Sequence, residues 1–554
     1  GNHVRAAKEG VLLLLQHVLP TAPPNLAHFL LGYSLADDVS RSQLSEAGAS
    51  GYPRTCLHSI LDILEQHIAS HNQQHREANN LVESCYRLVY WLCARPNTSA
   101  PILRFLRTRD YFLSRHVKAT VDLKEWEWCL LRRTLEELPV SVEAAIEPRW
   151  ELFQPQQLRQ AIASCDLPTG LGGKRISVSR VHALLTRELA ALHATAPQRN
   201  LVATEIQKVL DYVTEVNRQR NLAATLTHYY DSWRQLTEIL FCVAPHDILS
   251  LESRRNLLLN ILQDLLNKIP PSEVLPQLGN LASGTVLLLL VNLRHCYILQ
   301  KRESNQKSSE FEMSFFGPSN QIMQTNSLTL KFILHKILSW ILVSGGSTQK
   351  MRVNLYGALL NYLNIVNLKS SAADPEDENM SNTYVSRLDS SKARPSREES
   401  ALKSMVIDVI SEFGENLCGI VCGDCIGAGH DVCRMVALAC LDTLIEINPR
   451  TDWMHTLTNQ GYLRSLIDSL LQDDEGLKET LEPNPKSLRV LYVYESKMGL
   501  LIKMAGTRAG AETLLAQGAL GALAALTALA AHPDIHTARA THKDTDFVPS
   551  VANR

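Results

Sequence analysis

The sequence predicts an all-α protein, a solenoid built from stacked helices. Apolar residues recur at the i, i+3, i+4 and i+7 spacing of one helix face over most of the 554 residues. Runs that alternate with period two extend over only a few residues, so strands are not expected. Apolar residues make up 45% of the chain and charged residues 20%, which allows a sizeable core. A solenoid suits this length because each repeat buries its apolar face only against its neighbours.

The helical spacing runs from the start of the chain to its last apolar stretch. Val4 to Leu19 reads as one helix. Clear single-face groups follow, and they comprise Leu57, Ile60, Leu61, Leu64 and Ile68, then Leu81, Cys85, Leu88 and Leu92, then Val181, Leu184, Leu185, Leu189 and Leu192, then Ile206, Val209, Leu210 and Val213, then Leu257, Leu258, Ile261, Leu262 and Leu265. We therefore expect an overwhelmingly helical protein without a sheet.

Composition divides the chain into helical and irregular segments. We expect helical solenoid repeats over 1–300, a flexible loop over 301–327, helical repeats over 328–368, a disordered acidic and Ser-rich linker over 369–400, armadillo-like helical repeats over 401–533 and a flexible tail over 534–554. The linker offers almost nothing to bury, so the entropy cost of ordering it would not be offset. We expect it to be dispensable for stability.

A weak internal repeat lies near the end of the chain. Gly461 and Gly518 are each followed by Leu at the second and fifth positions and by an apolar residue at the sixth. The glycine can adopt the left-handed conformation at a helix end, and the Leu pair can start the next apolar face. This resembles the helix junction of armadillo repeats, although the spacing is longer than one standard repeat.

Charge and cysteine usage exclude some classes of partner and compartment. The 55 Lys and Arg nearly balance the 57 Asp and Glu, so the chain has no overall basic footprint for nucleic acid. The 12 cysteines lie mostly on apolar helix faces, as is typical of a reducing compartment. The longest aliphatic run, Val286–Val291, is too short to span a bilayer, and the Ala-rich stretch Leu514–Ala531 contributes little insertion energy. Because no initiator Met or signal peptide precedes Gly1, we interpret the chain as a fragment of a longer protein.

One cysteine-rich stretch could bind a metal. Cys422, Cys425, His430 and Cys433 approach the spacing of a zinc knuckle, but the final gap is two residues instead of four. Redox chemistry is a second interpretation. The third, which we favour, is that two helices meet at Gly427-Ala-Gly429 and that the cysteines are core residues. We therefore predict no stoichiometric metal.

The remaining motifs give no support for catalysis. Thr169-Gly-Leu-Gly-Gly-Lys174 is similar to a phosphate-binding loop, but Pro168 stands where the first Gly is needed and Arg175 where Ser or Thr is needed. We also expect no strand before it, so we interpret it as a flexible loop. Histidines such as His58, His182 and His335 occur singly. We predict no catalytic, cofactor-binding or metal-binding residues.

The candidate partner-binding residues are Tyr492, Tyr494 and Met498, on a helix that also carries Leu488 and Leu491. Tyr and Met are favoured in surfaces that bind partner helices. The alternative is that the two tyrosine rings complete the core.

Several segments resemble the large inner-ring scaffold nucleoporins of the nuclear pore complex. In chain order they are His28–Tyr33, Pro53–His58, Leu103–Thr108, Ser232–Leu236, Val353–Tyr362, Gly429–Met435, Gly461–Leu470 and Tyr492–Met498. They span most of the chain. Between about Val117 and Pro155 the sequence is shorter than the family pattern, which leaves the register through Trp126, Trp128 and Trp150 open.

The resemblance implies an irregular solenoid of armadillo-like and HEAT-like repeats that acts as a structural scaffold at the nuclear envelope. It implies linker nucleoporins as partners, docking through short amphipathic motifs, with a role in pore assembly and nucleocytoplasmic transport. Phe-Gly occurs only at Phe316-Gly317 and Phe413-Gly414, so the chain is not a Phe-Gly-repeat barrier protein. The alternative is a helical-repeat transport receptor or another non-catalytic adaptor. Near-balance of charge argues against a receptor for basic cargo.

Overall fold

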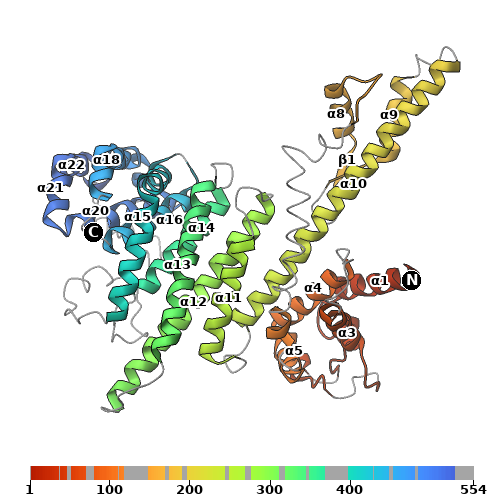
Figure 1. Cartoon of the computed structure of the whole chain (residues 1–554), viewed down its shortest axis with the longest axis horizontal. Helices are drawn as coiled ribbons and strands as arrows, with labels where there is room; N and C mark the ends of the chain where they lie inside the picture. Colours follow the sequence, from red (N-terminus) through yellow and green to blue (C-terminus); the bar gives the residue numbers. More distant parts are fainter. Residues whose placement is uncertain are drawn as a thin grey trace, which may run out of the picture. The chain divides into compact units, whose positions relative to one another are not determined.

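In the computed structural model of this protein, nearly all of the residues that the structure describes are helical (Figure 1). The described residues are 2–35, 38–45, 51–69, 80–109, 112–117, 148–168, 174–189, 196–243, 249–268, 276–310, 319–344, 349–367, 397–427, 429–447, 453–480 and 485–530. They form two compact units, Gly1–Ser250 with Lys268–Leu281, and Leu251–Asn267 with Ala282–Arg554. We call these unit 1 and unit 2. The predicted all-α fold class is confirmed.

The first part of unit 1 is a group of short helices around α4. It comprises α1 (Asn2–Val18), α2 (Leu26–Leu31), the 3-10 helix η1 (Val39–Arg41), α3 (Cys56–Ala69), α4 (Asn80–Ala94) and α5 (Pro96–Thr108). Helix α4 packs against α1, α3 and α5. Its predicted apolar face is buried, with Cys85, Leu88 and Leu92 fully inaccessible.

Two of these helices begin with a histidine that accepts a hydrogen bond from the backbone N–H three residues before it. The Oδ1 atom of Asn25 accepts hydrogen bonds from the backbone N–H groups of Ala27 and His28, and Nδ1 of His28 accepts one from the backbone N–H of Asn25. At the start of α3, Nδ1 of His58 likewise accepts from the backbone N–H of Thr55. Histidine here takes the place of the Glu or Gln of the usual capping box. The neutral ring is the accepting form, and burial lowers the pKa of both histidines.

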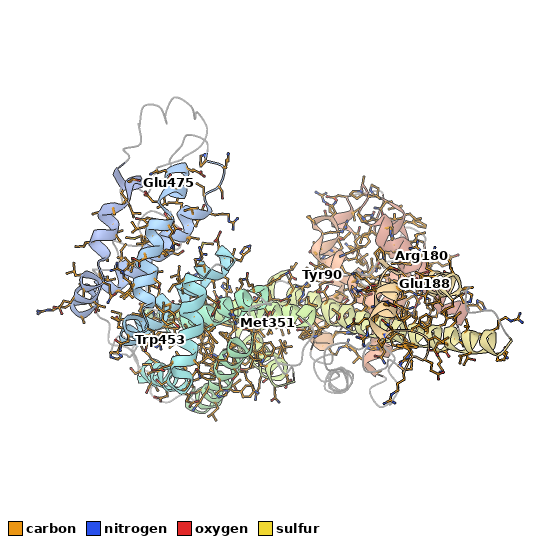
Figure 2. All side chains as sticks on the ribbon, turned by 90° about the horizontal axis from the view of Figure 1, so that it is seen from above. Tyr90, Arg180, Glu188, Met351, Trp453 and Glu475 are labelled. Carbon is orange, nitrogen blue, oxygen red and sulfur yellow. The ribbon has the colours of Figure 1, made fainter. Side chains whose placement is uncertain are left out.

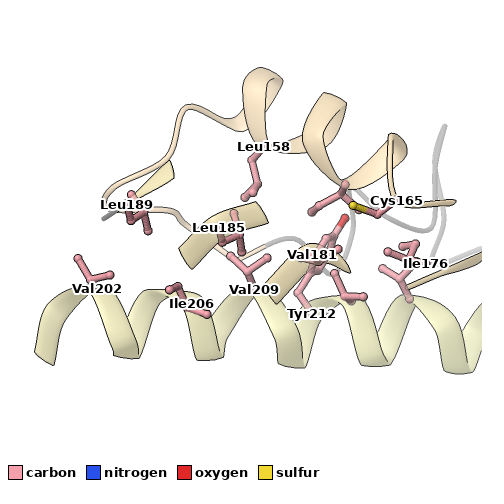
Figure 3. Packing of buried hydrophobic residues seen from close by; sticks show 13 residues of the cluster. Leu158, Cys165, Ile176, Val181, Leu185, Leu189, Val202, Ile206, Val209 and Tyr212 are labelled. Atoms are coloured by element: carbon pink, nitrogen blue, oxygen red, sulfur yellow. The ribbon is translucent and has the colours of Figure 1, made fainter. Parts of the chain in front are cut away.

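The second part of unit 1 is a small assembly packed on the long helix α10 (Ala196–Glu238), which ends in a π-helical turn, η3 (Ile239–Val243). The assembly comprises α8 (Pro155–Ala163), β1 (Asp166–Pro168), β2 (Lys174–Ile176) and α9 (Val178–Glu188), and we call it the α8–α9 cap. Figure 3 shows its core, in which Leu158, Val181 and Leu185 face Ile206 and Val209 of α10. The apolar spacing of α9 and α10 that the sequence predicted forms this core.

Polar contacts set the position of the cap on α10. The side chain of Asn217 makes two hydrogen bonds to one residue of β2, accepting from the backbone N–H of Ile176 at 2.8 Å and donating to its carbonyl at 2.9 Å. Arg220 and Asp166 form an ion pair at 2.8 Å. Backbone groups that would be unpaired beside the apolar core are thereby satisfied.

Two of our predictions are wrong at this hairpin. Strands β1 and β2 pair antiparallel, with Asp166 opposite Ile176, so the prediction of no sheet was wrong by one small hairpin. The Gly-rich segment does follow a strand, contrary to our expectation. Three-residue strands are too short to show period-two alternation in the sequence. A second strand follows the Gly-rich segment, whereas a helix follows a phosphate-binding loop. The segment itself, 169–173, lies outside the described residues.

Unit 2 consists of helices throughout its described part. They are α11 (Leu251–Lys268), α12 (Pro276–Glu310, whose first residues belong to unit 1), α13 (Ser319–Val343), α14 (Gln349–Val366), α15 (Arg397–Ile426), α16 (Asp431–Ile447), α17 (Trp453–Asn459), α18 (Tyr462–Gln472), α19 (Asp474–Thr480), α20 (Arg489–Ala505), α21 (Arg508–Ala516), α22 (Ala519–Ala525) and α23 (Thr527–Ala530). Figure 1 shows α13, α14, α15 and α16 side by side, as their contacts require.

Helices α12, α14 and α16 run parallel. Asn354 of α14 donates to Ser283 of α12 at 3.1 Å, and further along both helices Arg294 donates to Asn361 at 3.3 Å. Gln349, at the start of α14, accepts from the backbone N–H of His430, just before α16. Halfway along, the thiol of Cys440 donates to the carbonyl of Tyr356. Because each pair of contacts advances in the same direction along both helices, neighbouring helices are parallel.

Helix α20 extends this row. Arg489 at the start of α20 pairs with Asp431 at the start of α16, and Lys503 near its end pairs with Asp442 and Glu446 near the end of α16. We call α12, α14, α16 and α20 the parallel layer. A second row is formed by α13, α15, α18 and α22, which contact one another in that order. Two rows of helices that repeat along the chain are the architecture of a helical solenoid.

The predicted internal repeat is confirmed in its backbone but not in its side chains. Gly461 and Gly518 both adopt the left-handed conformation, with φ of 76° and 80°, directly before α18 and α22. In α18 the Leu pair, Leu463 and Leu466, is buried as expected. In α22, Ala519 and Ala522 are buried instead and Leu520 is exposed. The second helix therefore turns a different face inward.

Three segment boundaries differ from those we expected. The flexible loop predicted over 301–327 is wrong for the described residues, because α12 continues to Glu310 and α13 begins at Ser319. Lys, Arg and Glu after Gln300 are good helix formers, so the helix continues beyond its apolar stretch. Of the linker predicted over 369–400, residues 397–400 belong to α15 and the rest lie outside the described residues. The predicted tail lies outside them entirely.

Helix α12 contains the one described segment long and apolar enough to cross a membrane, Gly279–Arg302, judged by length and composition alone. Ser283 and Arg294 in this segment bond to α14, and the side chain of Leu287 lies against Gly357. These contacts are those of a core helix in a helical stack.

Replacing Asn217 should loosen the cap. Asn217→Ala leaves the N–H and carbonyl of Ile176 without their partner, and we expect it to lower the free energy of unfolding by about 1–3 kcal/mol. Hydrogen exchange should show faster exchange at Ile176. Thr214→Ala, one turn earlier on the exposed side of α10, is the control and should have little effect. Unchanged protection at Ile176 in the Asn217 variant would show that the cap is held by its apolar core alone.

Candidate partner-docking surface

Helix α20 is held in the parallel layer by charged groups at three levels. Besides Arg489 and Lys503, the buried Lys497 donates to Asp473 at 2.5 Å and to the carbonyl of Ser469 at 3.3 Å. Lys497 is only 2% exposed, and burial lowers its pKa. Residues Ser469 and Asp473 belong to the end of α18 and its cap, so this contact joins α20 to α18. The orientation of α20 about its own axis is set by these pairs.

That orientation separates the three candidate residues. Tyr492 is 51% exposed, Met498 is half-buried and Tyr494 is only 7% exposed. Residues two apart on a helix point to nearly opposite sides, so Tyr492 and Tyr494 do not share a surface. Burial raises the pKa of the Tyr494 hydroxyl, as expected for a ring in the core. The structure brings Tyr494 together with core residues and leaves Tyr492 and part of Met498 for a partner.

A residue that we did not select extends the outer face of α20. Ile502 is 52% exposed and lies ten residues after Tyr492, with Glu495 and Gly499 between them at i+3 and i+7. This spacing places all four on one side of the helix. The sequence signal was available, since i, i+3, i+7, i+10 is a helix stripe. Whether that stripe faces solvent or core depends on the contacts of α20 with other helices, including its ion pairs. The sequence did not predict these contacts.

The cysteine-rich stretch is part of the core between α15 and α16. Cys418, Cys422 and Cys425 lie at i, i+4 and i+7 of α15 and are buried, with the sulfurs of the first two 3.8 Å apart. Cys433 of α16 is also buried, and burial raises its pKa to about 11. His430 is exposed and its Nδ1 accepts from the backbone N–H of Val432. Across the placed residues, no three His, Cys, Asp or Glu side chains are arranged to hold a metal ion.

A polar network beside these cysteines joins three helices. Arg352 of α14 pairs with Asp424 of α15 at 3.1 Å and also bonds to Ser344, just after α13. The hydroxyl of Tyr356 donates to Asp424 at 2.6 Å. Each of these groups satisfies another that would otherwise be buried without a partner. Asp424 is 68 or more residues from the other members, so no spacing pattern could identify the network.

Two rows of stacked helices that repeat along the chain define the class of a helical-repeat protein. Comparison with known proteins gives the particular family. The family described as nuclear pore complex scaffold, nucleoporins 186/192/205, matches residues 4–129 and 133–551. The chain belongs to this family, which confirms the resemblance noted in the sequence, and it is therefore a nuclear pore complex protein of the nuclear envelope.

Two curated relatives agree with this assignment. The nuclear pore complex protein Nup205 of Homo sapiens is 31% identical over 604 aligned positions, covering 93% of this chain and 30% of the relative. Nup205 of Drosophila melanogaster is 31% identical over 464 positions, covering 76% of this chain and 22% of the relative. The chain thus spans less than a third of the length of these relatives.

The two tyrosines of α20 should differ sharply in their effect on stability. Tyr494→Ala removes a buried ring, and we expect the free energy of unfolding of unit 2 to fall by about 3 kcal/mol. Tyr492→Ala removes an exposed ring, and we expect a change below about 0.5 kcal/mol. Urea denaturation followed by circular dichroism measures both. Equal effects would mean that α20 is rotated relative to the arrangement described above.

Removal of the two partners of the Lys497–Asp473 ion pair should lower the free energy of unfolding by different amounts. Asp473→Ala leaves the Lys497 ammonium buried without its carboxylate, and we expect a loss of about 3–5 kcal/mol. Lys497→Met replaces the charge by an apolar chain of similar length and should be much less destabilising, because the remaining Asp473 is partly exposed. Urea denaturation followed by circular dichroism measures both variants. If both variants lose equal stability, the loss comes from the broken ion pair and not from leaving the Lys497 ammonium buried without a partner.

Proposed function

We propose that this chain is a non-catalytic scaffold of the inner ring of the nuclear pore complex, where it binds short amphipathic segments of linker nucleoporins. The observation that carries the proposal is the outer face of α20, where Tyr492 and Ile502 stand half exposed at helical spacing. Membership of the scaffold family supports the assignment to the pore. Binding of this kind would contribute to pore assembly and, through it, to nucleocytoplasmic transport.

Docking on α20 depends on how firmly the parallel layer holds this helix. Charged pairs at Arg489, Lys497 and Lys503 hold α20 in one orientation, so its apolar side chains are presented without a further ordering cost. A partner segment that is disordered when free can place i, i+3, i+4 and i+7 anchors on such a face. Its ordering costs several kcal/mol, so a single contact is expected to be moderate in affinity. Several contacts along one scaffold would hold an assembly by avidity.

The absence of catalysis is part of the proposal. The four cysteines of the Cys-rich stretch, Cys418, Cys422, Cys425 and Cys433, are buried in the core, and Nδ1 of His430 accepts a hydrogen bond at the start of α16. The Gly-rich loop joins two strands of a hairpin. Each motif that could have carried chemistry thus has a structural explanation.

Direct binding measurements test the proposal. Purified linker nucleoporins are titrated one at a time into the full chain by isothermal calorimetry. With the partner that binds, Tyr492→Glu and Ile502→Glu should each weaken affinity by about tenfold or more, because a charge replaces an anchor in a contact that excludes water. The melting temperature should stay near that of the wild type, since both side chains are half exposed.

Leu328→Glu is the matched control. Leu328 is a 73% exposed apolar residue of α13, in the second row of helices, so the same change is made away from the proposed face. It should leave affinity within about twofold. If all three variants bind equally well, α20 is not the docking surface. If no linker nucleoporin binds the wild-type chain, the proposed function of this part of the protein is wrong.

A further inference from the structure

The cations of the α8–α9 cap and of the part of α10 beneath it divide into paired and unpaired groups. On α10, Lys208 pairs with Glu151 and Glu205, and Arg218 pairs with Glu215. Four others, Lys174 and Arg175 of β2 with Arg180 and Arg187 of α9, are exposed and form no ion pair with any placed residue. Arg149, which precedes α8, and Arg199, which belongs to α10, are also exposed. We call Lys174, Arg175, Arg180 and Arg187 the basic strip.

The strip follows the outer side of the cap. Val181 and Leu185 of α9 point toward α10, as Figure 3 shows, and occupy the buried face of the helix. Arg180 and Arg187, seven residues apart, lie on the opposite side, about 10 Å from each other along the axis. Lys174 and Arg175 directly precede Ile176, which Asn217 anchors on α10. The backbone that carries all four cations is therefore held by the cap's own core.

One carboxylate accompanies these four cations in segment 174–189. It belongs to Glu188, which Figure 2 shows with Arg180 on the ribbon of the cap. The chain as a whole carries a net charge of −2, so this surface has the opposite sign to the average. Exposed like charges close together repel one another and add nothing to the stability of the fold. The apolar core and the contacts of Asn217 and Arg220 account for that stability without them.

We propose that the basic strip binds an acidic segment of a partner protein, one rich in Asp and Glu. This contact is separate from the apolar docking on α20, and it is made by unit 1 alone. Three of the four cations are arginines, whose planar guanidinium groups pair with carboxylates through two parallel hydrogen bonds. Between them α9 exposes the small residues Ser179, Ala183 and Thr186, which allow an acidic chain to lie close to the helix.

The composition of the strip disfavours two other anionic partners. Single-stranded nucleic acid is bound on aromatic side chains that stack with the bases, and segment 174–189 contains no Phe, Tyr or Trp and one histidine, His182. Stable attachment to an anionic membrane needs an apolar insertion beside the basic residues. Helix α9 exposes no large apolar side chain, and Leu167, opposite Arg175 in the hairpin, is only 36% exposed. An acidic protein segment requires neither feature.

Fluorescence anisotropy with the full chain tests this proposal. The probe is a labelled peptide of about twenty residues composed of alternating Glu and Asp, long enough to cover the strip in extended form. We expect saturable binding that weakens steeply between about 50 and 200 mM salt, because the contact consists of exposed charges. Arg180→Glu/Arg187→Glu should weaken binding by about tenfold or more at low salt. Arg180→Gln/Arg187→Gln, which keeps good helix formers, should give a smaller loss in the same direction.

The matched control is Arg41→Glu/Arg104→Glu. These arginines are exposed on η1 and α5 in the same unit, and neither forms an ion pair among the placed residues, so the change in net charge is identical. The control should bind within about twofold of the wild type. A control that loses as much affinity as the strip variant would show that net charge and not the strip is responsible. Tighter binding of a uridine oligonucleotide, or of phosphatidylserine vesicles, than of the peptide would overturn the choice of partner.

Discussion

The structure depends on one constraint, which is that each helix of unit 2 can bury its apolar face only against the helices next to it. Apolar contact alone is non-directional and tolerates sliding and rotation of one helix on another. The register of the parallel layer is instead set by polar contacts that have one geometry. Asn354 with Ser283, Cys440 with the carbonyl of Tyr356, and Arg489 with Asp431 each join helices distant in sequence.

In unit 1, too, apolar contacts form the core and polar contacts set the relative position of the elements. The long helix α10 supplies an apolar stripe to the α8–α9 cap, and Asn217 and Arg220 determine where the hairpin sits on that stripe. Both units therefore combine a generic apolar core with a few specific polar pairs. Such pairs contribute modestly to stability, since buried ion pairs are offset by desolvation, but removal of one partner is costly. They select one arrangement among several that would bury similar area.

This organisation suits a scaffold. A surface that binds by presenting side chains must hold them still, and both proposed contacts lie on elements whose orientation is fixed by anchored neighbours. The outer face of α20 presents the exposed apolar side chains Tyr492 and Ile502, whereas the strip on β2 and α9 is cationic, so the two would select different partner chemistries. Membership of the nuclear pore scaffold family provides the setting in which a chain with several distinct contact surfaces is useful.

The sequence by itself determined the helical class, most apolar faces and the family. Helical spacing is local information, so Leu57, Leu64 and Cys85 could be assigned to the core directly, and Gly461 and Gly518 to helix junctions. It did not reveal the short hairpin, because three-residue strands carry no readable period, nor the helix that continues through 301–310.

What only the tertiary structure decided is which side of an amphipathic helix faces outward. Tyr492 and Tyr494 were both candidates for a partner surface in the sequence. The structure separates them into surface and core, because Tyr494 is buried on the same face as Leu491 and Leu501 and Lys497 is held by Asp473 of a neighbouring element. In the sequence the four cations of β2 and α9 are indistinguishable from an ordinary solvated face, and only the structure shows that Asp166, on the strand paired with β2, forms its ion pair with Arg220 and not with them. Pairing depends on distances between segments that are remote along the chain, and those distances exist only once the chain has folded.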